Sequence, residues 1–114
     1  MKKNKKIKSD LAVIYARSTR GSEDDIADQL AMCIEFCDHV GLTPAHVFMA
    51  GGSSTTTECK RSVRETIEFC LDEKNDIAAL VVPSIDRITR NTNEFVGIRN
   101  RLKARGISLI GRIV

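Results

Sequence analysis

The chain has 114 residues, of which 29% are charged and 42% hydrophobic, and its formal net charge is +3. Such a composition is ordinary for one globular domain with a single core, and the positive charge permits a nucleic-acid partner without requiring one. No apolar run approaches the roughly 20 residues that cross a bilayer, and no secretory segment follows the basic start. We therefore expect a cytoplasmic protein with no membrane segment.

Five lysines lie between residues 2 and 8. We expect residues 1–9 to form a disordered, solvated tail, the alternative being an arm that binds nucleic acid. The four cysteines lack the paired spacing of a zinc site, so we expect reduced thiols, no metal site and no cofactor. These are Cys33, Cys37, Cys59 and Cys70.

The first predicted element is a strand over Leu11–Ala16, followed by a polar loop with two arginines and three hydroxyl side chains. A helix then begins after a cap at Ser22 or Asp24 and ends at Gly41. Its apolar positions recur at steps of three and four residues and are expected to face the core: Ile26, Leu30, Cys33, Ile34 and Cys37.

Pro44 introduces a second strand over His46–Ala50, and residues 51–57 form a loop rich in glycine and hydroxyls that we expect to be mobile. A second helix runs from about Glu58 to Lys74 or Asn75. Its inward face carries Val63, Ile67, Cys70 and Leu71.

The most apolar run of the chain, Ile77–Val82, is closed by Pro83 and predicts a buried strand of a parallel sheet. A polar loop leads from it into a helix over Thr92–Ala104, and Ile107–Val114 forms the last strand. The inward positions of that helix are Phe95, Ile98 and Leu102.

Strands and helices alternate along the whole chain, which predicts a three-layer α/β fold with helices on both faces of a mainly parallel sheet of four to five strands. The loops after Ala16, Ala50 and Val82 then lie at one edge of the sheet. Ligands of open α/β sheets bind at that edge.

Arginines and hydroxyl side chains gather in these loops. Planar guanidinium groups suit phosphate oxygens, and such a cluster can stabilise the charge of a phosphoryl transfer. We expect a cationic pocket around Ser18, formed by Arg17, Arg87, Arg90 and either Lys60 or Arg61.

With these residues, the sequence resembles the catalytic domain of the serine recombinases, which include resolvases, invertases, large integrases and transposases. The segments that carry the resemblance are IYARST (residues 14–19), Gln29, the GGSS loop with Lys60 and Arg61, and IDRITR (residues 85–90). The resemblance implies cutting and rejoining of DNA without metal, through a 5′-phosphoserine link and a free 3′ hydroxyl, by dimers that pair into a tetramer.

Carried over by position, the resemblance implies catalytic roles for Arg17, Arg87 and Arg90, with Asp86 supporting the last two. The arginine that usually opens the second helix matches Arg61 by chemistry or Lys60 by spacing. Gln29 could orient the active-site loop, or could be a solvated helix residue.

The nucleophile follows from the same alignment. The family usually has one residue between the first arginine and the serine, whereas Ser18 follows Arg17 directly. A one-residue deletion aligns Ser18 with the catalytic serine, so Ser18 is our choice. Ser22 is the second candidate and Thr19 the third, because its methyl group hinders in-line attack.

Family catalytic domains continue into a long dimerisation helix and a DNA-binding domain. We therefore expect residues 10–114 to be a catalytic domain truncated before both, and as a fragment it could be monomeric. Two other functions stay open: a catalytically degenerate DNA-binding or regulatory relative, and a small flavodoxin-like module that binds an anion or nucleotide with Gly51–Thr57.

Overall fold

A computed structural model of the chain describes residues 9–18, 23–51, 57–85, 88–89 and 91–111. Strands and helices alternate through the chain, with one short 3-10 helix between α2 and β3. The elements are β1 (Leu11–Ser18), α1 (Glu23–Val40), β2 (Thr43–Gly51), α2 (Thr57–Leu71), η1 (Glu73–Asn75), β3 (Ile77–Val82), α3 (Thr92–Ala104) and β4 (Ser108–Gly111).

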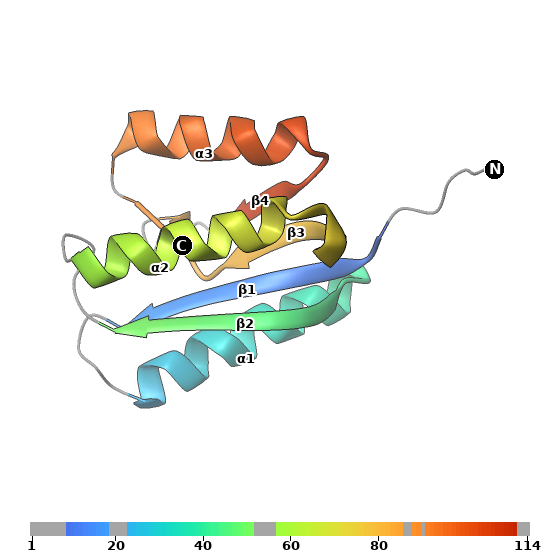
Figure 1. Cartoon of the computed structure of the whole chain (residues 1–114). Coiled ribbons are helices and arrows are strands. Elements are labelled where there is room, and N and C mark those ends of the chain that lie inside the picture. The colour runs from blue at the N-terminus through green and yellow to red at the C-terminus, as the bar shows by residue number, and fades with distance from the viewer. Residues whose placement is uncertain (1–8, 19–22, 52–56, 86–87, 90, 112–114) are drawn as a thin grey trace.

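The four strands form one parallel sheet in the order β2-β1-β3-β4. Helix α1 covers one face of the sheet, and α2 and α3 cover the other (Figure 1). The predicted three-layer parallel α/β fold is confirmed. Because the strands are parallel, their carboxyl ends lie at one edge, on the left in Figure 1, where the three helices begin.

Two hydrophobic clusters lie on opposite faces of the sheet, since successive side chains of a strand point to opposite faces. On the face of α2 and α3, Val13 and Tyr15 pack with Val63 and Ile67 of α2 and with Leu102 of α3. On the face of α1, the buried residues are Ala12, Ile14, Cys33, Cys37, Ala79 and Val81. Burial on both faces explains why the β1 and β3 sequences are almost continuously apolar.

The buried thiols belong to this core, as predicted. Cys33, Cys37 and Cys70 are all 3% exposed or less. Burial raises the pKa of the Cys70 thiol to about 12, and burial together with the neighbouring Cys37 raises the pKa of Cys33 to about 11. These thiols therefore stay protonated near neutral pH.

The second strand begins earlier than predicted. β2 starts at Thr43, and Pro44 lies within it, opposite Ala12 of β1. A proline lacks the N–H of a ladder bond and is tolerated in an edge strand, which β2 is. The register shifts by one residue after Pro44, so that His46 pairs with Val13.

Other boundaries also differ from the prediction. α2 ends at Leu71, and the predicted final turn is the separate helix η1, capped by the side chain of Asp72. The last strand begins at Ser108, and its predicted end lies outside the described residues. Ser9, assigned to the tail, donates a hydrogen bond to the Asp76 carbonyl, whereas residues 1–8 lie outside the described part.

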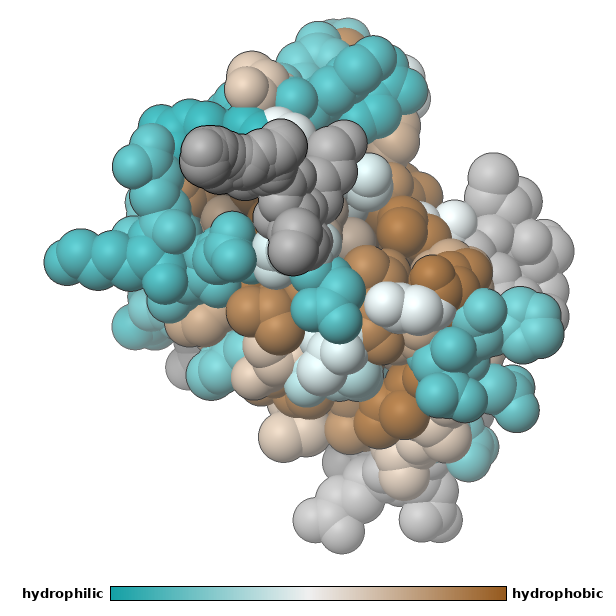
Figure 2. Space-filling model, turned by 90° about the vertical axis from the view of Figure 1, so that its right-hand side faces the viewer, coloured by the Kyte–Doolittle hydropathy of each residue, from teal (hydrophilic) through white to brown (hydrophobic). Residues whose placement is uncertain are grey.

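One residue predicted to face the core does not. Ile34 is 47% exposed, whereas Cys33 and Cys37 on the same helix are buried. β2 is an edge strand, and within the described residues no strand lies beyond it to cover the flank of α1 that carries Ile34. Hydrophobic residues also reach the surface between hydrophilic ones on the face shown in Figure 2. No helix in the described ranges is long and apolar enough to span a membrane.

Candidate functional site

The candidate site lies at the carboxyl edge of the sheet. β1 ends at Ser18, β2 at Gly51 and β3 at Val82, and the parallel register pairs Ser18 with Gly51. The predicted gathering of the three loops at one edge is therefore confirmed. Of the loop predicted over 51–57, Gly51 is the last residue of β2 and Thr57 the first of α2, and residues 52–56 lie outside the described part of the chain.

Arg17 lies near the end of β1, and its side chain is only 1% exposed. It shares strand parity with Val13 and Tyr15, which face α2 and α3. The guanidinium group therefore lies on the face of the sheet where α2 begins. A long cationic side chain buried at the end of a strand is uncommon and indicates a specific role.

The side-chain amide of Gln29 in α1 bonds both backbone groups of Arg17. Its Oε1 accepts from the Arg17 N–H at 3.1 Å, and its Nε2 donates to the Arg17 carbonyl at 3.0 Å. The β1–β3 register ends at Ile14 and Val81, while the β1–β2 register continues to Ser18. The amide of Gln29 thus pairs backbone groups that β3 no longer reaches.

This geometry excludes one of the two interpretations of Gln29. The residue is 4% exposed, so it is not a solvated helix glutamine. The sequence carried no signal for the choice, because the choice depends on where β3 stops pairing with β1.

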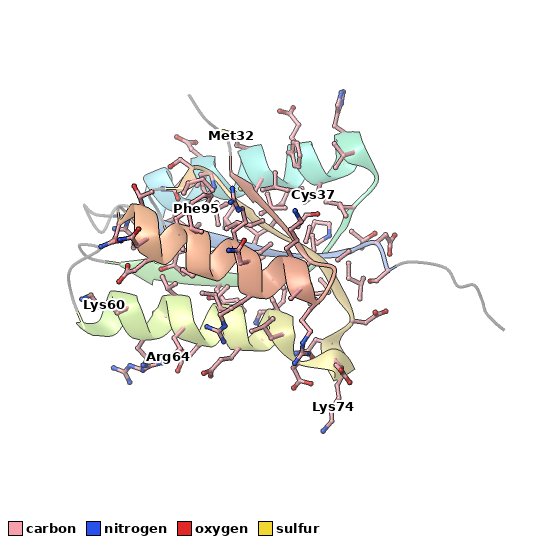
Figure 3. All side chains as sticks on the ribbon, turned by 90° about the horizontal axis from the view of Figure 1, so that it is seen from above. Met32, Cys37, Lys60, Arg64, Lys74 and Phe95 are labelled. Atoms are coloured by element: carbon pink, nitrogen blue, oxygen red, sulfur yellow. The ribbon has the colours of Figure 1, made fainter. Side chains whose placement is uncertain are left out.

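α2 contributes exposed cations next to the same edge. Lys60 and Arg61 are both exposed in the first turns of the helix, and Figure 3 shows Lys60 at the end of α2 closest to the carboxyl edge of the sheet. Arg64, which we did not single out from the sequence, is also exposed. It follows Lys60 by four residues and so lies on the same helix face.

The loop between β3 and α3 (residues 83–91) carries Arg87 and Arg90 and is called the arginine loop below. Its middle, at Ile88 and Thr89, is anchored. Ile88 is 5% exposed and belongs to the hydrophobic cluster under α2 and α3. The N–H groups of Ile88 and Thr89 both donate to the Ile85 carbonyl, at 2.9 and 3.2 Å. Asp86, Arg87 and Arg90 lie outside the described residues, so their convergence on Ser18 remains a prediction.

The choice among nucleophiles also remains a prediction. Ser18 is the last residue of β1, but its side chain is not among the described ones. Thr19 and Ser22, the two other candidates, lie outside the described residues.

A cavity of about 530 Å³ lies on the α1 face of the sheet, beside β3 and β4. Its lining is mainly apolar and includes Met32, Phe36 and Ile110. The described lining contains neither lysine nor arginine, so this cavity does not suit a phosphate.

Comparisons with known proteins agree with this geometry. Residues 12–111 match the family described as the resolvase N-terminal domain. No curated protein matches the chain in sequence.

Several solved structures share the fold. The C-terminal catalytic domain of ISC1926 TnpA, an IS607-like serine recombinase, superposes with a TM-score of 0.77 at 19% identity, covering 91% of this chain and 68% of that one. The first open reading frame of transposon ISC1904 from Sulfolobus solfataricus P2 gives 0.70 at 19% identity, with 88% and 65% covered. The N-terminal catalytic domain of TP901-1 integrase gives 0.70 at 18% identity, with 89% and 75% covered.

At these identities the structural likeness shows the fold alone, and the chain spans about two thirds to three quarters of the length of those structures. The family match, in contrast, runs from β1 to the end of β4. The chain therefore belongs to the resolvase N-terminal domain family, the catalytic domains of site-specific recombinases.

Proposed function

We propose that this domain cuts and rejoins DNA through a serine nucleophile, with Ser18 in that role. The Ser18 oxygen forms a bond to the scissile phosphorus and gives up its proton, while the bond from phosphorus to the 3′ oxygen breaks and that oxygen takes up a proton. The product is a 5′-phosphoserine link and a free 3′ hydroxyl. Attack by a 3′ hydroxyl on the phosphoserine reverses the step and rejoins the strand.

The single observation that carries this proposal is the buried Arg17 immediately before Ser18, with its backbone held by Gln29. An electrostatic group accelerates a reaction most when it is fixed in place before the charge develops. The two amide hydrogen bonds fix the backbone from which Ser18 follows. These bonds support a positioning role for Gln29 in the proposed site.

We assign the remaining stabilisation of the phosphate to Arg87, Arg90 and either Lys60 or Arg61. In other phosphoryl-transfer enzymes one well-placed arginine raises the rate by roughly 10³ to 10⁵. Several such groups could replace a metal ion, and Asp86 supports the arginines. On this proposal the reaction continues in the presence of a chelator.

The partner is DNA, and the cell compartment that we propose is the cytoplasm. The resemblance to serine recombinases further leads us to propose a homodimer that assembles into a tetramer for strand exchange. Sedimentation with and without DNA tests this assembly.

The test of the nucleophile is covalent capture. The protein is incubated with nicked duplexes of randomised sequence, in which cleavage releases a short strand bearing the 3′ hydroxyl and traps the protein on the 5′ phosphate. Ser18→Ala should abolish the trapped complex and leave non-covalent DNA binding intact. Peptide mapping by mass spectrometry should place the nucleotide on Ser18.

Two variants interpret the result. Ser108→Ala changes an exposed serine at the start of β4 and should leave capture unchanged. Ser22→Ala should retain capture as well. Loss of capture in Ser22→Ala but not in Ser18→Ala would move the nucleophile to Ser22, whereas binding without capture by the wild-type protein would support the degenerate relative.

A further inference from the structure

A chain of hydrogen bonds joins the arginine loop to the start of α3. The Asn91 N–H donates to the Thr89 hydroxyl oxygen at 3.0 Å, and that hydroxyl donates to Oε1 of Glu94 at 2.6 Å. The Glu94 N–H in turn donates to the Asn91 side chain at 3.0 Å. Every member of the chain thus both gives and receives a bond.

This arrangement differs from the usual capping box. There, the carboxylate of the third helical residue accepts directly from the N–H of the capping residue. Here Asn91 is the capping residue and Glu94 the third helical residue, but the Thr89 hydroxyl stands between them. A residue two positions before the cap is therefore built into the helix terminus.

The position of Thr89 gives this relay its significance. Thr89 is 9% exposed and lies between Arg87 and Arg90 in the sequence, next to Ile88, which is anchored in the core. The segment between the two arginines is thus fixed twice, by an apolar anchor and by a polar one. The polar bond is short and charge-assisted, the stronger class of hydrogen bond.

We propose that Thr89 and Glu94 are positioning residues that hold residues 88 and 89, the segment between Arg87 and Arg90, against the start of α3 so that the two arginines can meet the scissile phosphate. The inference rests on the proposed function, because it assigns the purpose of the loop. Neither residue touches the substrate; each acts through the backbone that carries Arg87 and Arg90. Small displacements of such groups matter, since about 1 Å of misplacement can lower a rate about 100-fold.

The first test measures order in the loop and needs no DNA. Thr89→Val removes the hydroxyl and keeps the branched shape, whereas Thr89→Ser keeps the hydroxyl. Amide hydrogen exchange over residues 86–91 should become about tenfold faster in Thr89→Val and stay near wild type in Thr89→Ser, which is the effect expected from one lost hydrogen bond of this class. Thr92→Ala, an exposed threonine in the first turn of α3, is the matched control.

A double-mutant cycle tests whether the Thr89 hydroxyl and the Glu94 carboxylate act together or independently. If the hydroxyl and the carboxylate act together, Glu94→Ala should add little to Thr89→Val, because the bond is already lost. Glu94→Ala also provides a second variant where Thr89→Val is poorly folded. Exchange over 86–91 that equals the control in both single variants would overturn the inference.

The second test measures covalent capture on the same nicked duplexes at saturating DNA. Thr89→Val should form the adduct about tenfold more slowly, with less than a twofold change in non-covalent affinity, and Thr89→Ser should restore the rate. If Thr89 had only a general structural role, Thr89→Val would lower the non-covalent affinity for DNA as well as the rate of adduct formation. Capture by Thr89→Val at the wild-type rate would overturn the inference. If the wild-type protein never forms an adduct, the proposed function is contradicted, and the hydrogen-exchange test alone decides on the relay.

Discussion

The pair of hydrogen bonds between Gln29 and the Arg17 backbone can be tested by Gln29→Met, which keeps a similar length and removes both bonds. The two backbone groups lie at a buried position, since Arg17 is 1% and Gln29 4% exposed. Each buried group left without a partner costs about 1–3 kcal/mol. We therefore expect the free energy of unfolding to fall by about 3 kcal/mol, a large part of the roughly 5–15 kcal/mol of a typical domain.

The assay is urea denaturation followed by circular dichroism, with the variant and the wild type compared at equal m values. Glu35→Ala, at an exposed position of the same helix, is the control and should change stability by no more than about 0.5 kcal/mol. A loss below about 1 kcal/mol for Gln29→Met, with an unchanged m value, would refute the view that this amide replaces β3 as the partner of Arg17.

A second variant tests the donor and the acceptor separately. In Gln29→Glu the carboxylate can still accept from the Arg17 N–H, but it faces the Arg17 carbonyl with no proton to donate. A protonated carboxyl group restores the donor, so the folded state should bind a proton more tightly than the unfolded state. The stability deficit of Gln29→Glu should therefore shrink as the pH falls toward about 4.3, the ordinary pKa of a glutamate, and a deficit independent of pH would contradict the pairing.

Two further predictions concern the buried thiols and two glycines. Burial raises the pKa of Cys70 to about 12 and that of Cys33 to about 11 from the ordinary 9.0. The contribution of these thiols to stability is therefore complete below pH 9.0 and is lost as the pH rises through the raised values, so the Tm should fall over this range. The Tm of Cys70→Ala should fall less steeply with pH, and an equal slope would contradict the assignment. Gly111→Ala places a methyl group against the Ile85 side chain and 3.1 Å from its backbone nitrogen, and should destabilise the domain by about 1–3 kcal/mol in urea denaturation. Gly97→Ala, in the open interior of α3, should instead stabilise it by about 0.5–1 kcal/mol, and equal effects of the two changes would argue against the close approach.

The hydrophobic periodicity and the capping and turn residues of the sequence predicted most of the fold, because both reflect local constraints. The apolar run of β3 indicated a buried strand and that of β1 a strand, and the structure buries both. α1 ends before Gly41, whose φ of +85° an ordinary L residue rarely adopts, and α3 spans the predicted residues with Asn91 as its cap. The alternation of elements also predicted which loops share an edge, since parallel strands allow only one arrangement of their carboxyl ends.

The motifs predicted the site in the same way, through residue types rather than through contacts. The arginine cluster and the family motif predict a site role for Arg17, and the structure adds that Arg17 is buried and that Gln29 holds its backbone. The relay through Thr89 was not foreseen. The sequence of a polar loop reads the same whether the hydroxyl of its threonine faces solvent or bonds a carboxylate five residues later.

The chain by itself therefore determined the elements, the parallel sheet and the edge at which the three loops gather, because helix and strand periodicities, caps and turns are read within a few residues. Only the tertiary structure decided the strand order, the exposure of Ile34, and the choice of Gln29 as the partner of Arg17. The last two depend on where one strand stops pairing with its neighbour and on where the sheet ends, and the first on which strands pair at all. Those limits are set by contacts between residues far apart in the chain, which no local pattern records.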